Sequence, residues 1–212
     1  GPRPLRDRVT YRLAQVTVAR LARLVWRLRV TGAERMPVGA VIVVANHESV
    51  LDPFFLGAAF RRPLRFVTKG ELFVGPLGWL LERLGGIRIV RGRGDLAALA
   101  RAEQALRCGH AVMMFPQGTT IPHGERPWLR GAARLARATG APILPVAIVD
   151  SEKALRPARV RVGFPSVKVL VGEPIAVERG PSTIAEAKAL TARARNAVEG
   201  LRTPQPPAHA RN

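Results

Sequence analysis

Short runs of β-branched and other apolar residues alternate with segments of helical periodicity over most of this sequence, and this alternation constrains the fold more than any other feature. The β-rich runs predict strands at Ala40–Ala45, Leu64–Thr68, Ile87–Val90, Ala111–Phe115, Ile143–Val149 and Lys168–Val171. The helical segments predict helices at Pro53–Phe60, Leu72–Leu84, Asp95–Arg107, Gly131–Thr139 and Thr183–Leu201. This order predicts an α/β fold in which a single domain has a mixed sheet flanked by helices.

The N-terminal segment Val9–Leu28 has helical periodicity, and its apolar and basic residues fall on opposite sides. One side carries Leu13, Leu21, Leu24, Val25 and Leu28, and the other carries Arg8, Arg12, Arg20, Arg23 and Arg27. Such a helix fits the bilayer interface, with its arginines among lipid phosphates. A surface helix packed on its own domain would show the same pattern. We expect a membrane-associating segment at residues 1–30, an α/β domain at 31–202 and a disordered, proline-containing tail at 203–212.

The sequence is strongly basic, with 34 Lys and Arg residues against 15 Asp and Glu residues and a formal net charge of +19. This excess indicates a negatively charged partner, such as nucleic acid, an anionic lipid surface or a phosphate-bearing substrate. The 7 Phe, 3 Trp and 1 Tyr residues leave few rings for base stacking, and no nucleic-acid-binding motif occurs, so nucleic acid is disfavoured. The longest charge-free apolar stretches, Leu72–Leu81 and Ala138–Val149, are too short to span a bilayer.

Polar residues directly follow the apolar strand Ala40–Ala45, in the order Asn-His-Glu-Ser-Val-Leu-Asp-Pro. Open α/β sheets place their active groups in such loops. His47 and Asp52 would lie about 140° apart on a helix and on opposite faces of a strand, so only a turn before Pro53 brings them together. An oriented His-Asp pair leaves the second ring nitrogen to act as a base. Alternatively, Asp52 caps the helix that begins at Pro53, and His47 only satisfies loop backbone groups.

Four segments carry a resemblance to a known family: Asn46–Asp52 (NHESVLD), Gly86–Arg91 (GIRIVR), Phe115–Thr120 (FPQGTT) and Ile143–Val146 (ILPV). They resemble, in order and spacing, four sequence blocks of the glycerophospholipid acyltransferases of the 1-acyl-glycerol-3-phosphate acyltransferase type. The first block of that family is NHxxxxD, and the third is FPEGTR. The resemblance extends over about residues 30–175, and it implies that the domain at 31–202 is an acyltransferase domain.

The resemblance also implies roles for individual residues. His47 would be the general base that takes the proton of the acceptor hydroxyl, and Asp52 would orient the imidazole. The turn at Phe115–Thr120 would present backbone N–H groups to the acceptor phosphate, which Arg91 would also bind. The implied phosphate-binding set is Lys69, Arg88, Arg91, Gly118 and Thr119.

Two positions of the third block depart from the family pattern. Gln117 stands where the family has glutamate, which keeps the shape and the hydrogen bonds of the side chain but removes its charge. Thr120 stands where the family has arginine, which removes a potential phosphate contact. These departures leave room for an acceptor other than lysophosphatidate, such as a different lysolipid or a glycolipid.

We therefore expect an enzyme of phospholipid biosynthesis that is bound peripherally or monotopically to the cytoplasmic face of the membrane. It would move an acyl group from acyl-CoA or acyl carrier protein to the free hydroxyl of a lysophospholipid, with 1-acyl-glycerol-3-phosphate giving phosphatidate. Its expected partners are anionic membrane lipids, the thioester donor and the lysophospholipid. A lipid-binding protein of the same fold without catalysis, or a basic nucleic-acid-binding protein, are the alternatives.

We expect no metal and no cofactor besides the thioester co-substrate. The single cysteine, Cys108, excludes a cysteine-rich zinc module, and His123 and His209 have no metal-ligand spacing. The segment Gly92–Ala97 has the G-x-G-x-x-A pattern of a dinucleotide fingerprint. The next predicted strand, Ala111–Phe115, does not end in the acidic residue that a ribose requires, so we discount this pattern.

Overall fold

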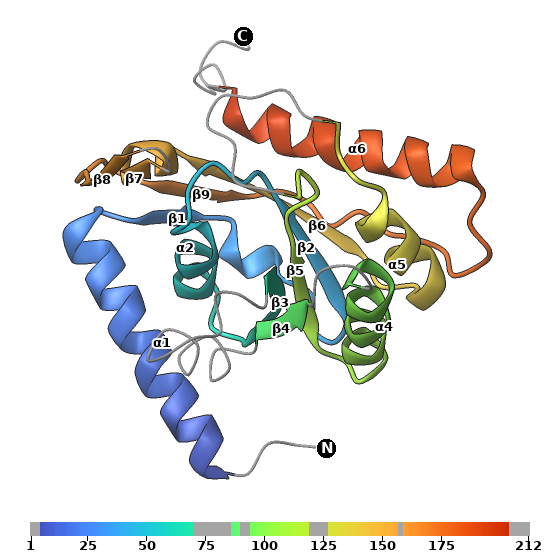
Figure 1. The fold of residues 1–212 in the computed structure, drawn as a ribbon, viewed down its shortest axis with the longest axis horizontal. Coiled ribbons are helices and arrows are strands. Elements are labelled where there is room, and N and C mark those ends of the chain that lie inside the picture. Colours follow the sequence, from blue (N-terminus) through green and yellow to red (C-terminus); the bar gives the residue numbers. More distant parts are fainter. Residues whose placement is uncertain (1–4, 70–85, 90–93, 119–126, 157–158, 204–212) are drawn as a thin grey trace, which may run out of the picture.

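The computed structural model describes residues 5–69, 86–89, 94–118, 127–156 and 159–203, and its elements are labelled as in Figure 1. One sheet has the strand order β1-β9-β6-β2-β5-β3-β4. Its strands are β1 (Arg29–Thr31), β2 (Val41–Ala45), β3 (Leu64–Lys69), β4 (Gly86–Ile89), β5 (Ala111–Met114), β6 (Ile143–Val149) and β9 (Lys168–Val171). The five strands from β6 to β4 run parallel to their neighbours, whereas β9 pairs antiparallel with β6. The predicted mixed sheet is confirmed.

Strand β2 is at the centre of this sheet, and its side chains contribute to two separate cores. Val41, Val43 and Ala45 pack against helix α2 (Asp52–Ala59) on one face. Ile42 and Val44 belong to the core on the other face. Successive side chains along a strand point to opposite faces of the sheet. Because both faces of β2 are covered, every residue of this strand is buried.

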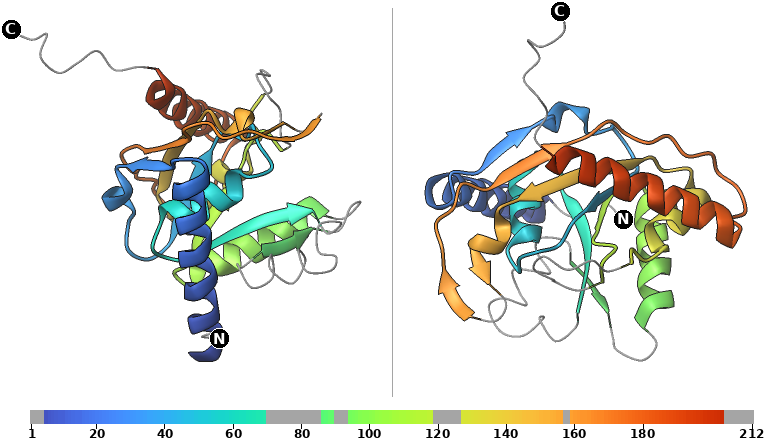
Figure 2. Two further views of the ribbon diagram at one scale, coloured as in Figure 1. Left: turned by 90° about the vertical axis from the view of Figure 1, so that its left-hand side faces the viewer. Right: turned by 90° about the horizontal axis from the view of Figure 1, so that it is seen from above.

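Helices cover both faces of the sheet (Figures 1 and 2). On the face opposite α2 lie α4 (Gly94–Arg107), α5 (Gly131–Thr139) and α6 (Ile184–Arg202). Helix α6 begins with a capping box in which the Thr183 side chain and Glu186 satisfy each other's backbone N–H groups. These helices and the six predicted strands agree with the sequence analysis to within about a residue or two at their ends. The predicted helix Leu72–Leu84 and the tail 204–212 lie outside the described residues.

Several short elements were not predicted from the sequence. Strand β1 has three residues and alternates exposed and half-buried positions, which is too little pattern to identify a strand. Strands β7 (Leu155–Arg156) and β8 (Arg159–Val162) form a separate antiparallel pair. Two 3₁₀ turns, η1 (Ala33–Arg35) and η3 (Ser151–Lys153), complete the described elements. Such elements are fixed by their neighbours in space rather than by their own sequence.

Helix α1 (Leu5–Val25) occupies most of the predicted N-terminal helix but ends earlier than the prediction. Arg27 has a φ of 44°, which turns the chain, and Leu28 is buried in the core. The prediction that Leu28 continues the apolar side of this helix is therefore wrong. None of the described helices combines the length and the hydropathy that crossing a membrane requires.

The contact between α1 and the domain uses small residues. Ala19 and Ala22 are buried, and the Gln15 amide donates hydrogen bonds to the carbonyl groups of Gly57 and Phe60 at the end of α2. Leu21 and Leu24 are 51% and 81% exposed. The apolar side identified in the sequence is thus a different face from the one that packs on the domain. The N-terminal end of α1 extends beyond the other described elements (Figures 1 and 2).

Candidate active site

The candidate site begins where β2 ends, because the next residue anchors the loop to the neighbouring strand. The side-chain amide of Asn46 donates to the carbonyl of Ile148 at 2.8 Å, and its oxygen accepts from the N–H of Ile148 at 2.8 Å. Asn46 is fully buried, and the two bonds extend the pairing between β2 and β6 through a side chain. They fix the direction in which the chain leaves the sheet. No local sequence pattern indicates this function of Asn46.

His47 and Asp52 meet within the turn that follows. The Nδ1 atom of His47 lies 2.9 Å from Oδ2 of Asp52, and the Asp52 side chain is completely buried. The His47 side chain retains 15% exposure. The contact expected from the sequence is therefore present, and the imidazole remains partly exposed.

The same carboxylate oxygen holds the intervening backbone. The N–H groups of Glu48 and Ser49 each donate to Asp52 Oδ2 at 2.8 Å. The N-cap of α2 is Leu51, and the structure shows no side-chain cap at this helix end. The alternative in which Asp52 serves as the helix cap is therefore wrong. The contacts from His47, Glu48 and Ser49 all reach the same Asp52 oxygen. They hold residues 47–52 in a compact turn.

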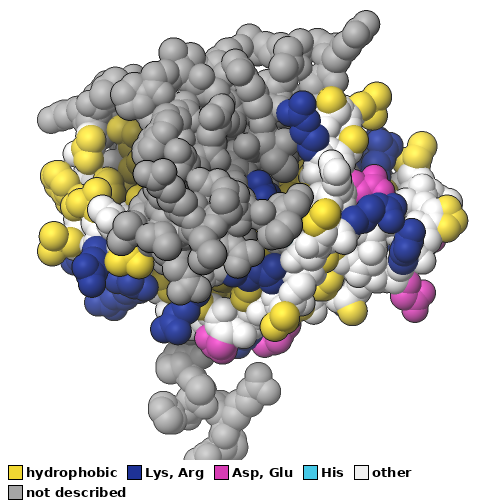
Figure 3. All heavy atoms as spheres, turned by 90° about the horizontal axis from the view of Figure 1, so that it is seen from below, with side chains coloured by type: hydrophobic (Ala, Val, Ile, Leu, Met, Phe, Trp, Pro, Cys, Tyr) yellow, Lys and Arg dark blue, Asp and Glu magenta, His cyan; other side chains and the backbone are white. Residues whose placement is uncertain are grey.

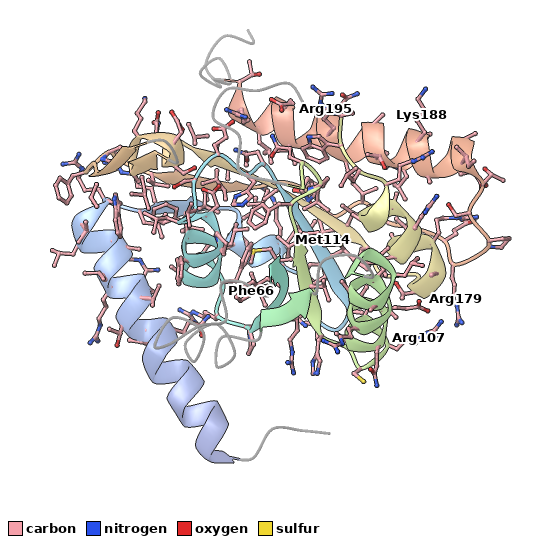
Figure 4. The ribbon with its side chains drawn as sticks, in the orientation of Figure 1. Phe66, Arg107, Met114, Arg179, Lys188 and Arg195 are labelled. Carbon is pink, nitrogen blue, oxygen red and sulfur yellow. The ribbon has the colours of Figure 1, made fainter. Side chains whose placement is uncertain are left out.

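Two residues of the loop after β5 contact His47. The Phe115 ring stacks on the imidazole with ring centroids 4.2 Å apart and an interplanar angle of 22°. The Gln117 side-chain oxygen accepts a hydrogen bond from the backbone N–H of His47 at 2.6 Å. Met114, which Figure 4 labels, is the last residue of β5 and leads directly into this loop. The first and third sequence blocks therefore build one site at the carboxyl ends of adjacent parallel strands.

Gly118 forms the tight part of the same loop. Its φ of 73° lies in the left-handed region that favours glycine. Its N–H donates to the carbonyl of Phe115 at 3.1 Å, so this amide closes the turn instead of facing an anion as the sequence analysis expected. A Cβ at this position would also approach Leu129 Cδ1 to 3.1 Å. Thr119 and Thr120 lie outside the described residues.

The remaining residues of the implied phosphate site come from the strands beyond β5. Lys69 ends β3 and Arg88 lies near the end of β4, where Thr68 is in register with Arg88. Strand β4 runs parallel to β3, β3 runs parallel to β5, and β5 runs parallel to β2. The carboxyl ends of β3 and β4 therefore lie at the same edge of the sheet as His47. Arg91 lies outside the described residues, as do the side chains of Lys69 and Arg88.

A second set of charged groups surrounds the residue after His47. Glu48 is 4% exposed, and its Oε1 atom lies 2.6 Å from Nη1 of Arg202, the last residue of α6. Burial raises the pKa of the Glu48 carboxyl, Arg202 acts to lower it, and the nearby carboxyls of Glu152 and Asp52 act to raise it. No sequence motif indicates this contact, because Glu48 and Arg202 are far apart in the sequence.

A model of the Acyltransferase family matches residues 27–149, more than half of this sequence. The chain belongs to this acyltransferase family. The family match includes the loop that carries His47 and Asp52 and the loop that carries Phe115 and Gln117. The resemblance inferred from the four sequence blocks is confirmed at the level of the family.

Two relatives from one species show how this chain compares with individual proteins. It is 35% identical over 167 residues to the 1-acyl-sn-glycerol-3-phosphate acyltransferase of Pseudomonas aeruginosa, covering 76% of this chain and 64% of that protein. It is 40% identical over 126 residues to the lyso-ornithine lipid O-acyltransferase of the same species, covering 58% of this chain and 45% of the relative. The chain thus spans less than two thirds of the length of either protein.

The fold of this chain also matches a solved structure. The crystal structure of PlsC, the 1-acyl-sn-glycerophosphate (LPA) acyltransferase from Thermotoga maritima, aligns with a TM-score of 0.75 at 25% sequence identity. The alignment covers 95% of this chain and 86% of that one. The similarity therefore includes the helices outside the residues that the family model matches.

Proposed function

We propose that this chain transfers a fatty acyl group from a thioester, acyl-CoA or acyl carrier protein, to the free hydroxyl of a lysophospholipid. The preferred acceptor is 1-acyl-glycerol-3-phosphate, which gives phosphatidate. The observation that carries the proposal is the 2.9 Å contact between His47 Nδ1 and the buried Asp52 carboxylate at the end of a central strand. Family membership and the named relatives supply the reaction class.

His47 acts as the general base in this mechanism. The neutral tautomer that donates Nδ1–H to Asp52 carries its lone pair on Nε2. Nε2 accepts the proton of the acceptor hydroxyl while the hydroxyl oxygen attacks the thioester carbonyl. Collapse of the tetrahedral intermediate breaks the carbon–sulfur bond, and the proton held by His47 goes to the departing thiolate. Asp52 stabilises the imidazolium formed in between, and no acyl-enzyme is required.

The acceptor phosphate would bind along the carboxyl edge of the parallel strands. Strands in a sheet are about 4.8 Å apart, so the end of β3 is about 10 Å and the end of β4 about 14 Å from the end of β2. Long basic side chains span part of these distances, and the acceptor itself, whose phosphate and free hydroxyl are at different ends of the glycerol, spans the rest. We assign Lys69, Arg88 and Arg91 to phosphate binding on this ground, with Thr119 in the loop after β5.

Peripheral attachment to an anionic membrane brings the donor and the acceptor together. Leu21 and Leu24 are exposed on a face of α1 that does not pack on the domain, and Arg20 and Arg23 of the same helix are also exposed. Figure 3, which shows the molecule from below relative to Figure 1, has Lys and Arg side chains next to exposed hydrophobic side chains. Apolar side chains among basic ones favour the interface of a bilayer that contains acidic lipids. We assign the cytoplasmic face because thioester donors occur there.

A lysolipid with another head group is a second candidate acceptor. The observation that favours it is Thr120, which stands where the family has an arginine able to contact a phosphate. The similarity to a lyso-ornithine lipid O-acyltransferase points in the same direction.

One assay tests both candidates. The purified chain is incubated with radiolabelled acyl-CoA or acyl carrier protein and with a panel of lysolipids in mixed micelles, and products are separated by chromatography. We expect phosphatidate from lysophosphatidate and loss of about 10⁴-fold or more in kcat for His47→Ala, with an unchanged circular dichroism spectrum. A folded His47→Ala variant with near-normal turnover would reject the mechanism. Transfer only to lysolipids without phosphate would select the second candidate.

A further inference from the structure

The buried carboxyl of Glu48 lies directly beside the candidate base in sequence but points toward α6. Its side chain is 5% exposed, and in the described part of the structure its Oε2 atom has no hydrogen-bond partner. Its backbone N–H donates to Asp52 Oδ2 at 2.8 Å. A movement of Glu48 therefore shifts a group that holds Asp52, and it shifts the residue that adjoins His47.

Arg202 is the positive charge that faces this carboxyl from α6. The guanidinium, whose side chain is 29% exposed, contacts Glu48 Oε1 at 2.6 Å. Helix α6 is anchored to the sheet through the buried residues Ala194 and Val198, so the guanidinium projects from a fixed support. Figure 4 shows Lys188, earlier on the same helix, projecting away from the rest of the molecule.

The charges around Glu48 explain why Arg202 matters. Glu152 of η3 is 6% exposed and Asp52 of α2 is fully buried, and both carboxyls act to raise the pKa of Glu48, as does burial itself. Arg202 opposes all three effects through its charge and its hydrogen bond. A buried carboxylate that loses its charge partner is costly, because its solvation is not replaced.

We propose that Arg202 and Glu48 form a positioning pair that connects the end of α6 to the His47–Asp52 loop and maintains the geometry of the base. The pair acts through the backbone on either side of Glu48 and does not contact the reacting atoms. This inference rests on the proposed function, since the geometry that it maintains is that of acyl transfer. It also extends the site to a helix that the family match at residues 27–149 does not include.

Steady-state kinetics of four variants test the pair: Arg202→Met, Arg202→Lys, Glu48→Gln with Arg202→Met, and the control Arg193→Met, which is exposed on the same helix. We expect kcat of Arg202→Met to fall about 10- to 100-fold with KM within about twofold, because displacing a reacting group by about an ångström has effects of this size. Arg202→Lys retains a charge and should recover most of kcat. Arg193→Met should match the wild type.

The pH profile separates positioning from packing. In Arg202→Met the buried Glu48 carboxyl has lost both effects that lower its pKa, so it takes up a proton more readily. Activity relative to the wild type should therefore recover as pH falls, and it should decline as pH rises. Adding Glu48→Gln removes the titrating group, so the double variant should show a higher kcat than Arg202→Met at neutral pH and no such recovery.

The outcomes distinguish this inference from the proposed function. A wild-type chain that transfers no acyl group to any lysolipid overturns both. An active wild type with equal kcat in Arg202→Met and Arg193→Met overturns the pair alone. So does a loss in Arg202→Met that is the same at every pH and is not relieved by Glu48→Gln, because that result describes lost packing of α6.

Discussion

Helix α2 has two neighbours that are held in different ways: the loop Asn46–Asp52 at its N-terminal end and helix α1 along its side. In the loop, the side chains of Asn46 and Asp52 are fully buried and hydrogen-bonded to backbone groups. In α1, alanines pack inward and leucines of the same helix remain exposed. The comparison shows one region whose backbone is held by hydrogen bonds from buried side chains and one that leaves apolar side chains exposed.

This difference agrees with the roles that we propose for the two regions. A base works only if its orientation is set before the substrate arrives, and buried hydrogen bonds to a rigid sheet provide that orientation. A membrane contact needs the reverse, because apolar side chains that are already buried in the protein contribute nothing to binding a bilayer. Stability is therefore expected to depend on the loop, and membrane affinity on the outer face of α1.

Asp52→Asn breaks the loop at its most connected atom, and we expect the largest effect from it. The asparagine has one oxygen to accept the N–H groups of Glu48 and Ser49 and no charge to stabilise an imidazolium. In serine proteases the corresponding change leaves the geometry intact and lowers kcat about 10⁴-fold, and a similar loss of kcat is expected here.

The control for Asp52→Asn is its circular dichroism spectrum and its KM for lysophosphatidate, which should remain near wild type. Single-turnover measurements would separate the chemical step from product release. If kcat stays within about tenfold of the wild type, Asp52 does not orient the base, and the 2.9 Å contact is only structural.

Leu21→Ser combined with Leu24→Ser tests the other region, with an intermediate effect. Burial of a leucine side chain contributes about 1.5–3 kcal/mol, so losing two exposed leucines should weaken binding to phosphatidylglycerol vesicles by about a hundredfold or more. The free energy of unfolding should change by less than about 0.5 kcal/mol, since neither side chain is in the core. Vesicle sedimentation and urea denaturation measure the two quantities.

A matched double variant, Leu96→Ser with Ile184→Ser, removes comparable exposed side chains from α4 and α6, on the opposite face of the sheet. It should sediment with vesicles as the wild type does. Equal loss of vesicle binding in both double variants would mean that general hydrophobicity, and not α1, governs attachment. Unchanged binding in the α1 variant would remove the role proposed for Leu21 and Leu24.

Local patterns in the sequence predicted much of this architecture. The β-branched runs located the strands, and the proline after Asp52 correctly indicated a turn that brings this carboxyl to His47. What the patterns missed depends on contacts between distant segments. Nothing near Asn46 specifies that its amide pairs with Ile148, and nothing near Glu48 specifies Arg202. Such contacts arise only when the sheet order and the packing of α6 are known.

The sequence was least informative where a residue type allows two uses. Gly118 suited an anion-binding turn, yet its N–H is used inside that turn. Leu28 fitted the apolar side of the N-terminal helix by its spacing, but the helix ends at Val25, the chain turns at Arg27, and Leu28 is buried. In both cases the backbone path, which local periodicity does not determine, decides the role.

Gln117→Glu is expected to have the smallest effect, and it distinguishes the two readings of this departure from the family pattern. If the neutral side chain weakened the acceptor site, restoring glutamate would raise kcat/KM for lysophosphatidate. The structure commits its oxygen to the His47 N–H instead, and a carboxylate accepts that hydrogen bond equally well. We therefore expect kcat/KM within about threefold of the wild type, since a hydrogen bond of this kind contributes about 1 kcal/mol and is retained.

Gln117→Leu, which removes the acceptor, should lower kcat by about tenfold with little change in KM. An increase of more than about tenfold for Gln117→Glu on phosphorylated acceptors alone would instead place this side chain at the substrate.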